Sequence, residues 1–181
     1  MIIFKKYLKL TIILTLCSFS IQSKQELCWY QQEIIDTFIT EYNKLSQRKN
    51  PQRLISFIYK YYLAKTDVLT DVSRDIIYET ILDHKLFDAY KKDNDEITKE
   101  GYTGKINADV LLCAQDIPGS ILKVKLIKKS EIDAIVSVSL DYLKPNYITI
   151  NLCKSGENWK IFDINAECYS FSLRKILLAD N

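Results

Sequence analysis

The sequence is poor in the residues on which most catalytic sites depend. Of its 181 residues, one is histidine and four are glycine. His84 lies between Asp83 and Lys85 in a predicted helix, and we expect it at the surface, because a histidine base needs an oriented partner within reach. No G-x-S-x-G, H-E-x-x-H or glycine-rich phosphate loop occurs. The sequence therefore predicts a protein that is not an enzyme and needs no cofactor.

The sequence also lacks an excess of positive or of negative charge. The whole chain has 25 Lys and Arg against 23 Asp and Glu, but Lys5, Lys6 and Lys9 lie in the first 23 residues, which contain no acid. The remainder has 22 basic against 23 acidic residues, a net charge of −1. Because nothing drives non-specific binding to phosphates, we exclude nucleic acid as a partner.

The N-terminus has the pattern of an export signal. The three lysines precede an apolar stretch, residues 10–17, that is short for a membrane span and is followed by small residues. We predict cleavage after Ser23, with Ser20 as the alternative. An uncleaved anchor is a second alternative, and acylation of Cys17 a third, although Leu16 is bulky where lipoproteins carry a small residue.

This interpretation assigns residues 1–23 to a signal peptide and residues 24–181 to a single domain. We expect a periplasmic or secreted protein with no integral membrane span after cleavage. Four cysteines remain in it, and an even number in an exported chain predicts two disulfides. No C-x-x-C pair occurs, so zinc and thioredoxin-like chemistry lack their usual spacing.

Helical patterns occupy the first half of this domain. Apolar residues recur at helical spacing over residues 29–45, and Asn50-Pro51 is a typical N-cap and first helical position. We predict a helix over residues 54–64, with a buried strand as the alternative. A third helix is predicted from Asp71 or Ser73 to Tyr90, with Val72 inward, and a long polar loop over residues 91–107.

From Ile121 the hydrophobic period becomes two. Strands are predicted over residues 121–129, 132–143, 147–153 and 159–164, followed by a helix over residues 170–178. Ile132 and Tyr142 lie on the expected buried face of the second strand. Helices followed by an antiparallel meander make an α+β fold with the helices on one face of a four-stranded sheet.

The meander ranks the possible disulfides. Cys153 and Cys168 lie near opposite ends of the last strand, about 20 Å apart at roughly 3.3 Å per residue, which is too far for a bridge. Cys113 precedes the first strand, at the end of the sheet where the last strand finishes. We therefore predict the disulfides Cys113–Cys168 and Cys28–Cys153.

Two short motifs resemble an exported bacterial family called domain of unknown function 3828. They are Ala114-Gln115-Asp116 and the G-x-x-W-K-I-F-D-I ending at residues 156–164. The resemblance covers roughly residues 33–177. It implies a fold similar to nuclear transport factor 2, a curved sheet wrapped by helices around a cone-shaped cavity, and no enzymatic activity. Residues 109–113 depart from the acidic or aromatic-rich run that the family carries before Ala-Gln-Asp.

Five residues are candidate binding residues: Gln115, Asp116, Tyr142, Trp159 and Asp163. Asp163 follows Trp159 and Ile161 at strand spacing, so on a face that lines a cavity it would be a buried general base. We favour the alternative, in which it accepts backbone hydrogen bonds and holds the last strand. Gln115-Asp116 is expected to form a turn rather than to bind a ligand.

Two charged stretches have simpler interpretations. The lysines at 123, 125, 128 and 129 are typical of a solvated edge that prevents pairing between sheets, with an anion-binding strip as the alternative. Residues 93–96 resemble a calcium loop, but Ile97 and Thr98 replace a ligand and the turn glycine, so we predict a solvated loop without metal.

Three functions are compatible with these features. We favour a non-enzymatic binding or accessory protein that engages another envelope protein, of which an immunity protein against a delivered toxin is a special form. The alternatives are a cone that binds a small molecule and an isomerase-like or hydratase-like enzyme that uses Asp163 as its base. Fold analogy alone supports the enzyme.

Overall fold

The computed structural model describes residues 29–97, 104–106, 108–114, 117–142, 146–169 and 172–179. The predicted signal peptide, Cys28, Gln115 and Asp116 lie outside these residues. The chain divides into two compact units, Met1–Thr37 and Phe38–Asn181. In the first unit, residues 29–37 are helical, and Trp29 and Tyr30 are exposed. No helix of the described part of the chain is both long and apolar enough to cross a membrane.

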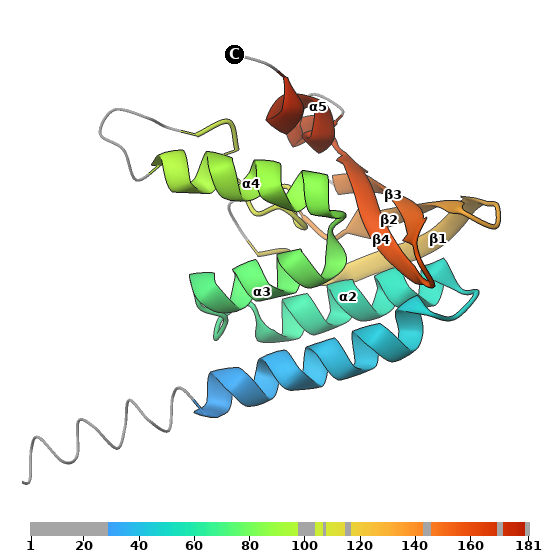
Figure 1. Ribbon diagram of the computed structural model, residues 1–181, viewed down its shortest axis with the longest axis horizontal. Helices are drawn as coiled ribbons and strands as arrows, with labels where there is room; N and C mark the ends of the chain where they lie inside the picture. The colour runs from blue at the N-terminus through green and yellow to red at the C-terminus, as the bar shows by residue number, and fades with distance from the viewer. Residues whose placement is uncertain are drawn as a thin grey trace, which may run out of the picture. The chain divides into compact units, whose positions relative to one another are not determined.

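The second unit contains helices followed by an antiparallel sheet and a short closing helix, which confirms the predicted α+β fold (Figure 1). After the helical residues 38–46, the elements are α2 (Pro51–Lys65), α3 (Asp71–Ile81), α4 (His84–Ile97), β1 (Ile121–Lys129), β2 (Asp133–Leu140), β3 (Asn146–Ser155), β4 (Asn158–Asn165), the 3₁₀ helix η1 (Glu167–Tyr169) and α5 (Leu173–Leu178).

The stretch that could have been a helix or a strand is the helix α2. The side chain of Asn50 accepts a hydrogen bond from the backbone N–H of Arg53 at 3.0 Å, and Pro51 follows as the first helical residue. Of the aromatic residues of α2, Tyr59 and Tyr62 are fully buried, and Phe57 and Tyr61 are half-buried. A good N-cap and a complete apolar face therefore outweigh the β-branched and aromatic composition of this segment.

The predicted helix from Asp71 to Tyr90 is wrong in one respect, because it is two helices. Leu82 adopts an extended backbone and bridges to Ile161 at the outer edge of β4, where the N–H of Asp83 donates to the carbonyl of Ile161 at 2.9 Å. Asp83 then caps α4, its Oδ1 accepting from the N–H of Lys85 at 3.0 Å. Pairing with a distant strand thus overrides a continuous helical period.

Two further expectations for this region are wrong. The predicted loop over residues 91–107 begins later, because α4 continues to Ile97. Val72, predicted inward, is 69% exposed. Its neighbour Ser73 is buried instead, with its N–H donated to the N-cap oxygen of Thr70 at 3.2 Å. The capping geometry of the first turn therefore decides which side faces the core.

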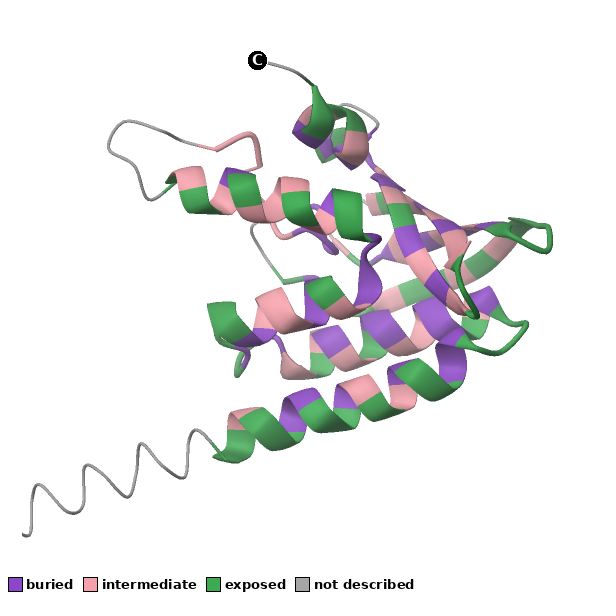
Figure 2. Ribbon diagram, in the orientation of Figure 1, coloured by how far each residue is buried: buried purple, intermediate pink, exposed green. Residues whose placement is uncertain are grey.

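The sheet has the order β1-β2-β3-β4 with all neighbours antiparallel. One face is apolar and forms the core beneath the helices, with alternate residues of β2 and β3 fully buried (Figure 2). We call the other side the open face, since no strand residue on it is buried. β2 is shorter than predicted: Ile132 precedes it and is 64% exposed, and Tyr142 follows it and is half-buried.

A β-bulge changes the direction of the side chains in β4. Leu152 pairs with Ile161 and Asn151 pairs with Asp163, so Phe162 is an extra residue. The buried positions are therefore Trp159, Ile161 and then Ile164 rather than Asp163. The prediction that Asp163 shares a face with Trp159 and Ile161 is wrong, because a bulge shifts the alternation by one residue.

Candidate functional site

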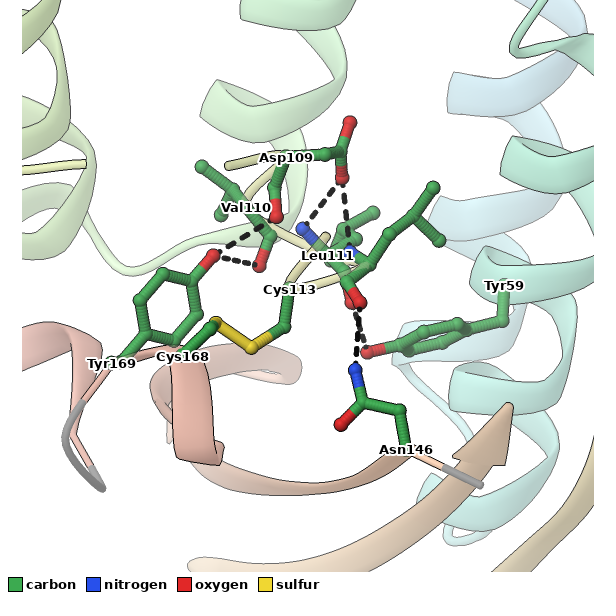
Figure 3. Close-up of a disulfide and its surroundings, with 9 residues drawn as sticks. Tyr59, Asp109, Val110, Leu111, Cys113, Asn146, Cys168 and Tyr169 are labelled. Atoms are coloured by element: carbon green, nitrogen blue, oxygen red, sulfur yellow. Dashed lines mark hydrogen bonds between the residues drawn. A yellow bond between two sulfur atoms is a disulfide. The ribbon is translucent and has the colours of Figure 1, made fainter. Parts of the chain in front are cut away.

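A tight turn ahead of the sheet is fixed by a disulfide. Cys113 is bonded to Cys168 in η1, with their Cα atoms 5.8 Å apart, which confirms this predicted pair (Figure 3). Cys113 has a φ of 54°, in the left-handed region that residues other than glycine seldom adopt. The bond links the 109–113 turn to η1, which follows β4. Residues 109–113 form no strand or helix, so the disulfide helps to fix their position.

Side chains from three elements bind the carbonyls of the 109–113 turn. The hydroxyl of Tyr59 in α2 donates to the carbonyl of Leu111 at 2.8 Å, and that of Tyr169 in η1 donates to the carbonyls of Asp109 and Val110 at 2.9 and 3.1 Å. The amide of Asn146 in β3 donates to the carbonyl of Leu112 at 3.3 Å. Figure 3 shows these groups converging on the turn.

The carboxylate of Asp109 organises the same turn from within. Its Oδ1 accepts the N–H groups of Leu111 and Leu112 at 2.9 and 3.0 Å. Its Oδ2 accepts the hydroxyls of Tyr62 and of Tyr78, the latter at 3.2 Å, and the two hydroxyls lie 2.7 Å from each other. One carboxylate therefore joins α2 and α3 to the turn.

Burial keeps these tyrosines neutral. Desolvation, followed by the negative charge of Asp109, raises the pKa of both Tyr62 and Tyr78 well above the usual value for a phenol. The pKa of Tyr59 is raised for the same first reason. A neutral phenol is a donor, so at neutral pH the cluster satisfies the carboxylate with hydroxyl protons.

A pocket of about 260 Å³ opens beside this cluster, among α3, α4, Ile106 and residues 108–110. Arg74, Tyr78 and Tyr90 line it from the helices, and Asp109 lines it from the turn. Asp93 also lines it and is buried, accepting the backbone N–H groups of Lys105 and Ile106 at 2.8 and 3.1 Å. The prediction of a solvated loop at residues 93–96 is therefore wrong, because Asp93 lies in α4 and anchors the next segment.

The structure does not bring the predicted binding residues together. Trp159 is 1% exposed in the core, and its indole N–H donates to the carbonyl of Arg48 at 3.1 Å. Tyr142 is half-buried after β2. Gln115 and Asp116 lie outside the described residues, so their role stays a prediction.

Asp163 holds the start of α5. Its Oδ1 accepts the N–H groups of Ile164 and Arg174 at 2.8 and 2.9 Å, and its Oδ2 accepts the hydroxyl of Ser172 at 2.9 Å. These contacts agree with the hypothesis that Asp163 has a structural role and not with the hypothesis that it is a general base. A carboxylate that accepts three donors has little capacity left for a substrate proton.

The strand β1 carries four lysines at one edge of the sheet. It is an edge strand in which every residue is exposed or half-buried (Figure 2). Two irregularities in its pairing leave Leu122 and Ile127 without a partner in β2, and both are more than half exposed. Such bulges, with lysines between them, disfavour pairing with another sheet.

The strand register aligns polar rows across the open face. Lys123 pairs with Ser139, which pairs with Tyr147, and Tyr147 is 67% exposed. In the next row, Lys125 pairs with Ser137, which pairs with Thr149. We call these six residues the lysine face; it combines two ammonium groups, three small hydroxyls and one exposed phenol.

The other residues considered for catalysis or metal binding form no site in the described part of the chain. His84 is exposed at the start of α4, as predicted. Cys153 is half-buried in β3 and bonded to neither Cys113 nor Cys168, and burial raises the pKa of its thiol. Because Cys28 lies outside the described residues, the Cys28–Cys153 bond stays a prediction. Within the ranges described, no group of three or more His, Cys, Asp or Glu could hold a metal ion.

Sequence patterns missed the pocket beside the Asp109 cluster. Arg74 and Tyr78 lie in α3 and Asp109 in a turn 31 residues after Tyr78, and no sequence motif links these two segments. Comparison with known proteins adds no further assignment, since no family model, no curated protein and no solved structure matches the chain. The resemblance to domain of unknown function 3828 therefore stays a prediction.

Proposed function

We propose that this chain is an exported binding protein that engages another protein of the cell envelope through the lysine face. The observation that carries the proposal is the surface formed by β1 and the open face. It has ammonium groups, hydroxyls and an exposed tyrosine in aligned rows, beside two exposed apolar residues at the bulges. Tyrosine is enriched at protein interfaces because it offers both contact area and a hydrogen bond.

The charges of this surface favour an acidic partner. Lys123, Lys125, Lys128 and Lys129 are all exposed on one strand of nine residues that carries no acid. Opposite charges across an interface accelerate encounter and select the partner. An immunity protein that blocks a delivered toxin is the special form of this function that we retain, with the toxin as the acidic partner.

The disulfide between Cys113 and Cys168 agrees with export, since such bonds persist in oxidising compartments. The predicted signal peptide agrees with it independently. Periplasmic or secreted localisation thus forms part of the proposal, and sequencing the N-terminus of the purified protein tests it, with residue 24 expected first.

Cross-linking in the native host tests the binding function. The full chain, tagged at its C-terminus, is purified after cross-linking as wild type, as Lys123→Glu/Lys125→Glu, and as a matched control, Lys85→Glu/Lys92→Glu. The control makes the same charge change at two exposed lysines of α4. We expect wild type and control to capture one dominant acidic protein, and the β1 variant to lose at least about 90% of it.

Two results would contradict this proposal. Equal capture by the β1 variant would show that the partner binds elsewhere. No captured protein in any sample, with the tagged chain exported and folded by circular dichroism, would remove the protein-binding function itself.

A further inference from the structure

Three turns meet at one end of the second unit. The ammonium of Lys129 donates to the carbonyl of Lys49 at 2.6 Å, and the backbone N–H of Lys154 donates to the carbonyl of Ile132 at 2.8 Å. These contacts join the turn before α2, the turn between β1 and β2, and the turn between β3 and β4 (Figure 1). We call these turns with their flanking residues the turn end: residues 46–50, 127–133 and 154–158.

The turn end is basic although the chain as a whole is not. Its charged residues are five basic and three acidic ones: Arg48, Lys49, Lys128, Lys129 and Lys154 against Glu131, Asp133 and Glu157. The rest of residues 24–181 has 17 basic against 20 acidic residues, out of the 22 and 23 in that range. An anionic surface therefore attracts this end of the molecule and repels the remainder, which orients the protein.

The positive charges of the turn end are not paired with its acids. In the described part of the chain, none of the five basic side chains forms an ion pair with a carboxylate. Lys49, Lys129 and Lys154 line a groove of about 870 Å³, which Glu131 and Glu157 also line. Desolvation lowers the pKa of the Lys154 ammonium; the charge of Glu157 opposes this shift and that of Lys129 adds to it. An external anion beside these lysines is therefore favoured.

Two aliphatic side chains are exposed at the same end. Ile127, at a bulge of β1, is 55% exposed, and Ile132, in the turn between β1 and β2, is 64% exposed. Figure 2 shows the three turns as exposed. Segments that bind the membrane interface combine such apolar groups with lysines, because the apolar groups enter the headgroup boundary while the ammonium groups stay at the level of the phosphates.

We propose that the turn end binds the surface of a membrane that contains anionic phospholipids. Ile127 and Ile132 enter the boundary between headgroups and acyl chains, and the lysines lie beside the headgroup phosphates. A bilayer suits this site because it is flat and anionic, and the three turns lie together at one end. The proposal uses residues outside the lysine face and needs no protein partner, so either proposal can fail without the other.

Co-sedimentation with lipid vesicles tests this surface. The full chain is purified after export and mixed, at about 50 mM salt, with vesicles of phosphatidylcholine alone or with about 30% phosphatidylglycerol. We expect at least about tenfold stronger binding to the vesicles that contain phosphatidylglycerol. Most of this binding should be lost at about 1 M salt, where the screening length falls to about 3 Å.

Variants of the turn end separate its charges from its apolar groups. Lys128→Gln/Lys129→Gln should bind about 25-fold more weakly, since each lysine near an anionic surface contributes about fivefold. Ile132→Ser should bind at least about fivefold more weakly, because it loses the apolar group that enters the bilayer. If the double lysine variant does not melt cooperatively, Arg48→Gln/Lys49→Gln replaces it.

Matched controls make the same changes elsewhere on the surface. Lys85→Gln/Lys92→Gln alters two exposed lysines of α4, and Val72→Ser alters an exposed aliphatic residue of α3. Both should bind the vesicles as wild type does.

Three results would overturn the proposal. One is a wild-type protein that melts cooperatively and binds neither kind of vesicle. Another is equal binding to both kinds, which would show that anionic headgroups are not recognised. The third is unchanged binding of the turn-end variants, which would place the membrane contact elsewhere, such as in an uncleaved signal peptide.

Discussion

At the scale of single residues, the carboxylate of Asp109 accepts hydrogen bonds from three separate segments of the chain. It receives two backbone N–H groups from its own turn and two hydroxyls from α2 and α3. Removing the carboxylate would leave buried donors without an acceptor, and that loss costs more than the hydrogen bonds contribute on balance. Its neighbours in the sequence suggest only a turn.

Replacing Asp109 by alanine should therefore lower the free energy of unfolding by about 3 kcal/mol. Asp109→Asn keeps one acceptor oxygen and should cost about 1 kcal/mol. Urea unfolding followed by tryptophan fluorescence measures both values.

Asp88→Ala, at an exposed position of α4, is the control and should stay within about 0.5 kcal/mol of wild type. A similarly small effect of Asp109→Ala would mean that the tyrosine hydroxyls find other partners and that the cluster does not hold the turn.

At the scale of elements, the junction of α3 and α4 connects the helices to the last strand and to α5. Leu82 and Asp83 pair with the free edge of β4 through Ile161, which covers backbone groups that an edge strand would otherwise expose. Oδ2 of Asp83 forms an ion pair with Arg174 of α5, and the guanidinium of Arg174 also lies 4.0 Å from the centre of the Phe162 ring.

This ion pair should show coupling in a double-mutant cycle. Both side chains are largely buried, 10% exposed for Asp83 and 16% for Arg174. Asp83→Ala should cost about 3 kcal/mol, because it leaves a buried guanidinium without its carboxylate and removes the cap of α4. We expect Asp83→Ala/Arg174→Met to cost at least about 1 kcal/mol less than the sum of the single changes.

Asp83→Asn separates the cap from the charge, since its side-chain oxygen still accepts the N–H of Lys85. Additivity of the two single changes within about 0.3 kcal/mol would show that Asp83 and Arg174 act independently.

At the scale of the whole molecule, the core buries several tyrosine side chains. Tyr42, Tyr59, Tyr62, Tyr78 and Tyr169 are all buried and donate to carbonyls, to a carboxylate or to each other. Burial raises the pKa of every one of them above its usual value. The folded state therefore resists their ionisation.

Stability should fall as the pH rises above about 10. Below that value the phenols are neutral in both states and the full stability is present. Above it the unfolded chain releases protons that the folded chain retains, so the free energy of unfolding drops by up to about 1.4 kcal/mol per pH unit for each such tyrosine. Urea unfolding between about pH 8.5 and 11 measures the slope.

Tyr59→Phe is the matched variant, because it removes one phenol and changes no lysine. Its slope with pH should be shallower than that of wild type. Tyrosinate absorbance that rises for the buried tyrosines as well as the exposed ones, while circular dichroism remains native, would contradict the prediction.

Local sequence patterns determined much of this fold. The cap at Asn50, the four strands and the α+β class follow from capping and periodicity, which act over a few residues. The Cys113–Cys168 bond joins residues 55 apart and follows from the order of the strands in the meander. Capping and strand alternation depend on neighbouring residues, and the order of the strands can be read along the chain, so the sequence displays these features.

Only the tertiary structure decided the rest. The break at Leu82 exists because β4 offers a partner, and the bulge at Phe162 turns Asp163 away from the core to hold α5. The pocket around Arg74 arises where two helices meet a turn. Each depends on hydrogen bonds between segments far apart in the chain, and such bonds leave no periodic trace in the sequence.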